Sequence, residues 1–105
     1  NLLSIAIEQQ IDGSWNDVPS AIKVIKFNDQ DFISILEKIK KWADSKNFDK
    51  KNMPIVVGTL ITLIFFERYM KETHDIWRLM STKALKALNS IDSNINWIIL
   101  MKSMI

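Results

Sequence analysis

Cysteine is absent from this chain of 105 residues, which excludes disulfide bonds, thiolate nucleophiles and cysteine metal ligands. Glycine and proline occur only twice each, so no glycine-rich phosphate-binding loop is present. The single histidine, His74, has no cysteine partner, and its acidic neighbours Glu72 and Asp75 do not share metal-ligand spacing on one helical face. No nucleophile elbow occurs either. We therefore predict a chain without catalytic residues, metal site or cofactor, with His74 exposed at the start of a helix.

The excess of positive charge is small, because the formal net charge is +2. This value does not argue for nucleic-acid binding by itself. Six lysines do cluster in sequence, but Asp44 and Asp49 interrupt them, so we interpret the cluster as a solvated helix face and expect no nucleic-acid partner. These lysines are Lys38, Lys40, Lys41, Lys46, Lys50 and Lys51.

Long hydrophobic runs are also missing. An uncharged, mostly apolar run extends from Met53 to Phe66, which is shorter than the roughly 20 residues that span a bilayer. We expect no membrane segment and see no signal peptide. The lack of cysteine fits an intracellular protein better than a small secreted one, so we expect a cytoplasmic location. Because the chain begins at Asn1 without an initiator methionine, we interpret it as a single helical domain, residues 1–105, from the C-terminal end of a larger protein.

Helical periodicity runs through most of the sequence, and no segment shows the alternation of a half-buried strand. We predict an all-α fold, a compact bundle of about five helices. The helix from Ile55 to about Lys71 should be central, because its first three turns are apolar on every side. Pro54 suits its first turn, and Gly58 would let a neighbouring helix approach closely.

Helix boundaries follow from capping residues and polar breaks. Asn28 is a good N-cap, with Phe27 and Phe32 as a hydrophobic staple around it. Thr73 is the predicted cap of the helix that contains Trp77. Two polar stretches, 47–52 and 89–96, are predicted to be a loop and a helix break.

A turn motif near the N-terminus consists of Gln10, Asp12, Gly13 and Trp15. Gly13 reaches positive φ without steric cost, and we place it at or near the C-cap of the preceding apolar helix. Trp15 then folds back over that helix, and a glutamine amide satisfies backbone groups left unpaired at the turn. The motif is thus predicted to serve folding and to provide no chemistry.

The C-terminal segment is the predicted interaction site. Its apolar residues recur at helical spacing and can form one stripe: Trp97, Ile98, Met101, Met104 and Ile105. Such a stripe either completes the bundle or anchors a partner, and tryptophan and methionine are both suited to interfaces. We predict that it binds a protein partner by laying a helix in a groove. The face from Lys38 to Lys51 is the next candidate.

The turn motif is the first part of a broader resemblance to a known protein family, which covers roughly residues 1–90. The chain resembles the C-terminal helical region of proteins that combine a vault-inter-α-trypsin domain with a von Willebrand factor A domain. In that family an apolar helix enters a Gln-x-x-Asp-Gly-Ser-Trp-like turn, which matches residues 9–15. An apolar helix with a charged exit and a tryptophan helix with Lys-Ala repeats follow, as in residues 57–68 and 75–88.

The family includes a vault-associated poly(ADP-ribose) polymerase whose C-terminal region docks on the major vault protein. The resemblance therefore implies a non-catalytic domain that docks its parent protein onto the vault, a ribonucleoprotein particle. Any catalytic domain of the parent would lie elsewhere.

A second resemblance leads to an alternative. Gln10, Gly13 and Trp15 also fit one Gln-Trp repeat of terpene cyclases and related α/α toroids. A second copy and the acid-rich cyclase motif are missing from the sequence. A von Willebrand factor A domain upstream of Asn1 would favour the interaction domain, whereas further Gln-Trp repeats would favour part of a toroid enzyme.

Overall fold

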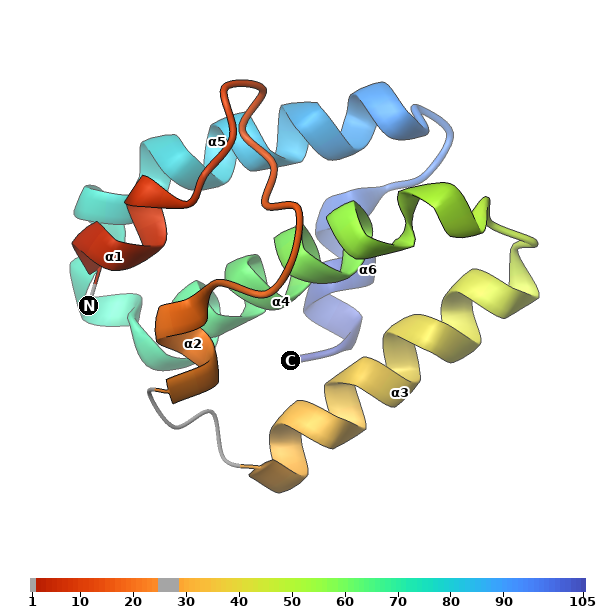
Figure 1. Ribbon diagram of the computed structural model, residues 1–105, viewed down its shortest axis with the longest axis horizontal. Helices are drawn as coiled ribbons and strands as arrows, with labels where there is room; N and C mark the ends of the chain where they lie inside the picture. Colours follow the sequence, from red (N-terminus) through yellow and green to blue (C-terminus); the bar gives the residue numbers. More distant parts are fainter. Residues whose placement is uncertain (1, 25–28) are drawn as a thin grey trace.

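The computed structural model describes residues 2–24 and 29–105. Within them the chain forms six α helices and two short 3₁₀ helices, and no strand (Figure 1). The predicted all-α bundle is confirmed. The elements are α1 (Leu2–Ile7), α2 (Ser20–Val24), α3 (Asp29–Ser45), η1 (Lys50–Asn52), α4 (Met53–Tyr69), η2 (Lys71–Thr73), α5 (His74–Ile91) and α6 (Trp97–Ser103).

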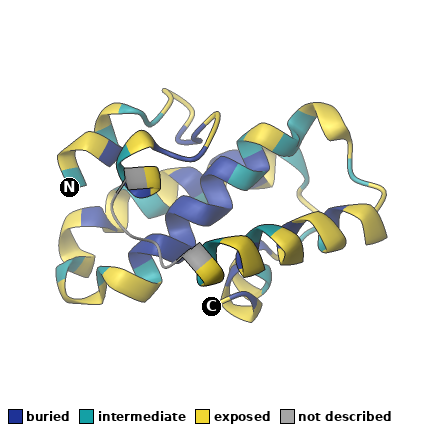
Figure 2. Cartoon of the chain, turned by 60° about the horizontal axis from the view of Figure 1, so that its bottom comes forward, coloured by how far each residue is buried: buried dark blue, intermediate teal, exposed yellow. Residues whose placement is uncertain are grey.

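Helix α4 forms the centre of the fold, as its uncharged sequence predicts. Every residue from Gly58 to Phe66 is buried, and Figure 2 shows this helix as the continuous buried element of the chain. Helices α3, α5 and α6 all pack against it. Pro54 lies in its first turn, where the missing N–H removes no hydrogen bond. The helix ends at Tyr69 and not at Lys71, because Met70 leaves helical geometry and η2 begins after it.

Aromatic side chains pack at both ends of α4. Near its C-terminal end, Phe66 stacks on Trp77 with ring centroids 5.1 Å apart and meets the edge of Trp15 at 6.1 Å. Just before its N-terminal end, Phe48 lies with Trp42 and Trp97, whose centroids are 5.5 Å apart. Both clusters join residues far apart in sequence, so they tie the outer helices to the central one.

Several predicted boundaries are wrong in detail. Helix α5 continues through Asn89 to Ile91, because Ile91 packs on the core and extends the helix into the predicted break. The predicted loop at 47–52 contains η1. Thr73 precedes α5 without a side-chain cap, since its hydroxyl donates to the Met70 carbonyl at 3.1 Å. The predicted N-cap and staple at Asn28 and Phe27 lie outside the described residues.

Gly58 permits close approach, but of a loop and not of the predicted helix. A Cβ at Gly58 would lie 2.6 Å from the backbone of Asp17 and 2.8 Å from the Trp15 carbonyl. The segment that follows the turn motif therefore runs directly over α4.

No single helix in the described parts of the chain is long and apolar enough to cross a membrane. Residues 50–69 and 71–91 meet the length and composition criteria as a pair, with a bend of 97° between them.

Candidate functional site

The turn motif packs closely on α5, and its details differ from those expected from the sequence. Gly13 has φ of +100°, and a Cβ there would collide with the Lys83 carbonyl on α5. Helix α1 ends at Ile7, so Gly13 is not its C-cap. The glutamine that bonds the turn is Gln9, because its amide donates to the carbonyls of Gly13 at 2.8 Å and Met80 at 3.1 Å. The predicted Gln10 side chain is exposed and only reaches the Glu8 carbonyl at 3.5 Å.

Asp12 and Trp15 complete this unit. The backbone N–H and the hydroxyl of Ser14 donate to the Asp12 carboxylate at 2.9 and 2.7 Å, and they lower the pKa of Asp12. Trp15 is buried, and its indole N–H donates to the carbonyl of Ile5 in α1 at 3.0 Å, so it does fold back over that helix. The Asp12 carboxylate and the Trp15 indole thus each have a partner within the fold, whereas the Gln10 side chain has only its neighbour Glu8.

The predicted C-terminal stripe divides into two faces. Trp97, Met101 and Met104 are buried in the core, and the indole N–H of Trp97 donates to the Asp92 carbonyl at 3.0 Å. The idea of Trp97 as an exposed anchor is therefore wrong, because the indole packs between α3 and the Phe48 loop. Ile98 and Ile105 stay exposed, at 47% and 46%.

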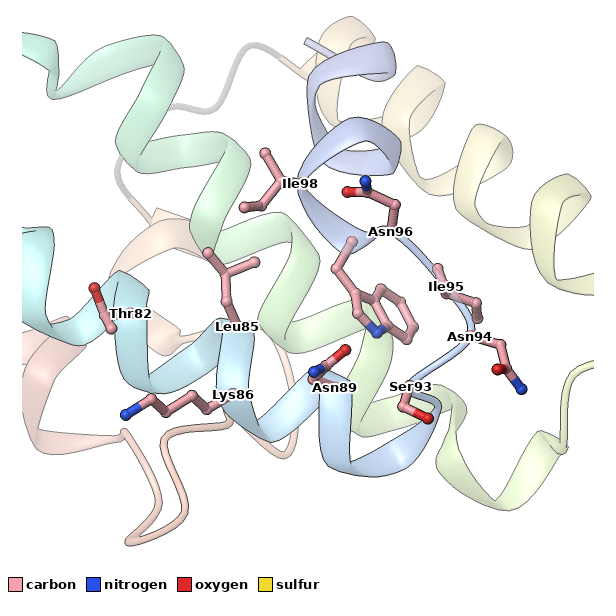
Figure 3. Close-up of a pocket in the computed structure, with 10 residues that line it drawn as sticks. Thr82, Leu85, Lys86, Asn89, Ser93, Asn94, Ile95, Asn96 and Ile98 are labelled. Atoms are coloured by element: carbon pink, nitrogen blue, oxygen red, sulfur yellow. The ribbon is translucent and has the colours of Figure 1, made fainter.

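A groove of about 560 Å³ lies beside Trp97, between the C-terminal half of α5 and the start of α6 (Figure 3). Leu85 from α5 and Ile98 from α6 point toward one another across it. Thr82 and Lys86 lie at one end, whereas Ser93 and Asn94 lie at the other. Such a volume falls within the range of about 300–1,000 Å³ typical of binding pockets.

Exposed polar side chains line part of this groove. The amides of Asn89 and Asn94 and the hydroxyl of Ser93 make no hydrogen bond to the described residues. Asn96 uses its Oδ1 to accept from the Ile99 N–H at 3.1 Å, which caps α6 and leaves the NH₂ group available. The groove therefore combines an apolar centre with unused donors and acceptors.

Sequence reasoning missed most of this site. It interpreted 89–96 as a polar break, and it did not consider that three asparagines at 89, 94 and 96 flank a buried tryptophan. That cluster was the available signal. Of the predicted stripe, only Trp97 and Ile98 line the groove.

The other predicted surfaces are simpler. The six clustered lysines are all exposed, in agreement with a solvated face. His74 is exposed at the start of α5, with its ring edge-on to Trp77 at 4.6 Å. In residues 2–24 and 29–105, no three His, Cys, Asp or Glu side chains gather as a metal site would require.

Comparisons of the chain with protein-family models, with curated proteins and with solved structures gave no match.

Proposed function

We propose that this chain is a non-catalytic protein-interaction domain whose partner binds in the groove between α5 and α6. The observation that carries the proposal is the pairing of exposed Ile98 and half-buried Leu85 with the unused amides of Asn89 and Asn94. Apolar anchors surrounded by polar groups that can pair across the contact are typical of protein interfaces.

The vault shell is the partner that the sequence resemblance favours. The segments that carry this resemblance are residues 9–15, 57–68 and 75–88 of the sequence. In this proposal the domain holds a cytoplasmic parent protein on the major vault protein. The α/α-toroid alternative stays a prediction that the sequence upstream of Asn1 tests.

Co-sedimentation with purified vault particles tests this proposal. The 105-residue chain should appear in the vault pellet, and Ile98→Asp should remove it because a carboxylate enters the apolar centre of the groove. Ile76→Asp is the matched control, since Ile76 is exposed on the opposite half of α5 and does not line the groove. Both variants should keep the circular-dichroism spectrum of the parent chain.

Two outcomes would count against the proposal. Absence of the parent chain from the pellet contradicts the vault as partner. Equal retention of the Ile98 and Ile76 variants contradicts the groove as the binding site.

A further inference from the structure

We propose that the Asp12–Gly13 pair is a site of aspartate isomerisation that reacts in the unfolded chain and is protected in the folded one. The proposal concerns the turn motif and does not depend on the groove between α5 and α6. No other aspartate in the sequence is followed by glycine. Because glycine has no side chain to hinder attack by its backbone nitrogen, this pair is intrinsically the most reactive aspartate sequence of the chain.

The reaction needs neither an enzyme nor a cofactor. The backbone nitrogen of Gly13 attacks the side-chain carboxyl carbon of Asp12, a C–N bond forms, and the carboxyl hydroxyl leaves with the amide proton as water. The product is a five-membered succinimide ring. A water molecule then opens the ring, and opening at the main-chain carbonyl leaves the backbone running through the former side chain. The resulting isoaspartate has the mass of aspartate and one additional backbone carbon.

The folded structure holds the attacking nitrogen in another interaction. The Gly13 N–H donates to the carbonyl of Gln10 at 3.0 Å, and the Gly13 carbonyl accepts from the Gln9 amide at 2.8 Å. Gly13 is also buried against α5, where an added Cβ would collide with the Lys83 carbonyl. Rotation of the glycine backbone toward the Asp12 side chain would therefore break hydrogen bonds inside a close contact.

The carboxyl group of Asp12 is held as well. One of its oxygens accepts from the Ser14 N–H at 2.9 Å and from the Ser14 hydroxyl at 2.7 Å. Ser14 is buried, so water has little access to these donors. The two hydrogen bonds lower the pKa of Asp12 and keep its carboxyl group ionised. The carboxylate is the less reactive form, because the hydroxyl that must leave is absent.

The turn cannot open without the loss of core contacts. Trp15 follows it directly and is buried, with its indole N–H on the Ile5 carbonyl and its backbone N–H on the Thr59 hydroxyl, both at 3.0 Å. The Gln9 amide also donates to the Met80 carbonyl at 3.1 Å. The turn is thus tied to α1, α4 and α5. We expect its protection to be lost only when the domain unfolds cooperatively.

Incubation of the whole chain at neutral pH in a series of guanidinium chloride concentrations tests the proposal. Trypsin then releases residues 1–23 as one peptide, because Lys23 is the first lysine or arginine of the sequence. Liquid chromatography separates the isoaspartate peptide from the parent peptide of equal mass. Its rate of formation should follow the unfolded fraction measured by circular dichroism, and it should be at least about tenfold slower in the folded chain.

Three variants make the test specific. Thr59→Val removes a buried acceptor and should move the isomerisation curve and the unfolding curve together to lower denaturant, whereas Thr82→Val should leave both in place. Asp12→Glu should remove the product even in the unfolded chain, because glutamate would have to form a six-membered ring. Asp17 lies in the same tryptic peptide and is an internal reference, since the branched side chain of Val18 hinders attack there.

Isomerisation should also prevent the turn from forming again. The additional backbone carbon displaces Gly13 relative to the residues before it, and the contact with Lys83 has no room for one more atom. The purified isoaspartate chain should therefore melt at a lower temperature than the parent chain after the denaturant is removed. Equal melting temperatures would contradict this part of the proposal.

The protection itself would be disproved by equal rates of isoaspartate formation in the folded and unfolded chains. A rate that rose at denaturant concentrations at which circular dichroism still reports a folded domain would also contradict it. Reaction at Asp17 as fast as at Asp12 in the unfolded chain would overturn the assignment of the site. Co-sedimentation with vaults depends on none of these results, so the proposed function is tested separately.

Discussion

Trp15 and Thr59 are 44 residues apart in sequence, and hydrogen bonds join the backbone of Trp15 to the side-chain hydroxyl of Thr59. The Trp15 N–H donates to the Thr59 hydroxyl at 3.0 Å, and that hydroxyl lies 3.4 Å from the Trp15 carbonyl, to which it donates. Thr59 is fully buried in α4, so no water can replace it as a partner. This contact fixes the turn motif on the central helix.

Thr59→Val should therefore lower the free energy of unfolding by about 1–3 kcal/mol, because it leaves the buried Trp15 N–H without an acceptor. Thr59→Ser should recover most of the loss. Thr82→Val is the matched control, since the exposed Thr82 hydroxyl only donates to a carbonyl of its own helix. Urea unfolding measures all three, and equal values for Thr59→Val and Thr82→Val would show that the contact has no energetic role.

Gly13→Ala should also destabilise the domain, by about 1–3 kcal/mol. The φ of +100° disfavours a side chain, and the new Cβ would lie 2.8 Å from the Cβ of Lys83. Ile11→Ala lies in the same turn at a fully exposed position and should change stability by less than about 0.5 kcal/mol. Thermal unfolding gives the melting temperatures of the two variants. An unchanged melting temperature for Gly13→Ala would show that this position tolerates a side chain.

Leu63→Ala should cost about 2–5 kcal/mol, because Leu63 is 1% exposed in the middle of α4. Leu79→Ala deletes the same atoms from a side chain that is 70% exposed and should cost little. Because both variants replace leucine with alanine, the difference between their free energies of unfolding in chemical denaturation reports the effect of burial alone. Similar losses in both variants would contradict the central position of α4.

Trp97→Ala should lower stability by about 3–5 kcal/mol, and removal of residues 97–105 should unfold much of the domain. The reason is that Trp97 packs against Trp42 and Phe48 and is only 4% exposed. Ile99→Ala on the exposed face of α6 is the control. A truncated chain that kept its circular-dichroism signal and cooperative melting would show that α6 is dispensable for folding.

Asp12 should make stability depend on pH in the acidic range. The backbone N–H and then the hydroxyl of Ser14 lower its pKa in the folded state, so the ionised form stabilises the fold. This contribution is present above the ordinary aspartate pKa of about 3.9 and is lost as pH falls through the lower folded-state pKa. Asp12→Asn should be less stable than the parent chain at pH 7, and the difference should shrink towards pH 2.

Unfolding free energies at the two pH values measure this effect, with Asp44→Asn on the exposed face of α3 as the control. A constant difference between Asp12→Asn and the parent chain across this range would contradict the role of the carboxylate.

The sequence predicted the helices better than it predicted which segments pack against them. The lack of charge from Met53 to Phe66 was sufficient to identify α4 as the core helix, because a solvent-facing side would need polar residues. Gly58 indicated that another segment packs closely on α4, but the spacing of nearby residues could not show whether that segment is a loop or a helix. The end of α5 was predicted too early, because polar residues such as Asn89 and Ser90 are typical of a helix break. In the structure the helix continues to Ile91, which packs against the core.

The candidate site was harder to predict for the same reason. Helical spacing placed Trp97 and Ile98 in one apolar segment, yet their environments differ because Trp42 and Phe48, about 50 positions earlier in the sequence, cover only the former. Which face of α6 meets solvent is decided by those distant contacts. The groove itself is formed by two helices and their connection, so no local pattern contains it.

The two aromatic clusters at the ends of α4 also give the protein a pair of built-in optical probes. Trp15 and Trp77 both contact Phe66, whereas Trp42 and Trp97 contact each other and Phe48. Replacing either pair with phenylalanine would leave the emission of the other pair to report on one end of the domain. Within each variant, coincident unfolding curves from tryptophan emission and circular dichroism would mean that the domain melts as one cooperative unit. Separate curves would reveal a partly folded species in which the end that carries the remaining tryptophans opens at a different denaturant concentration from the rest.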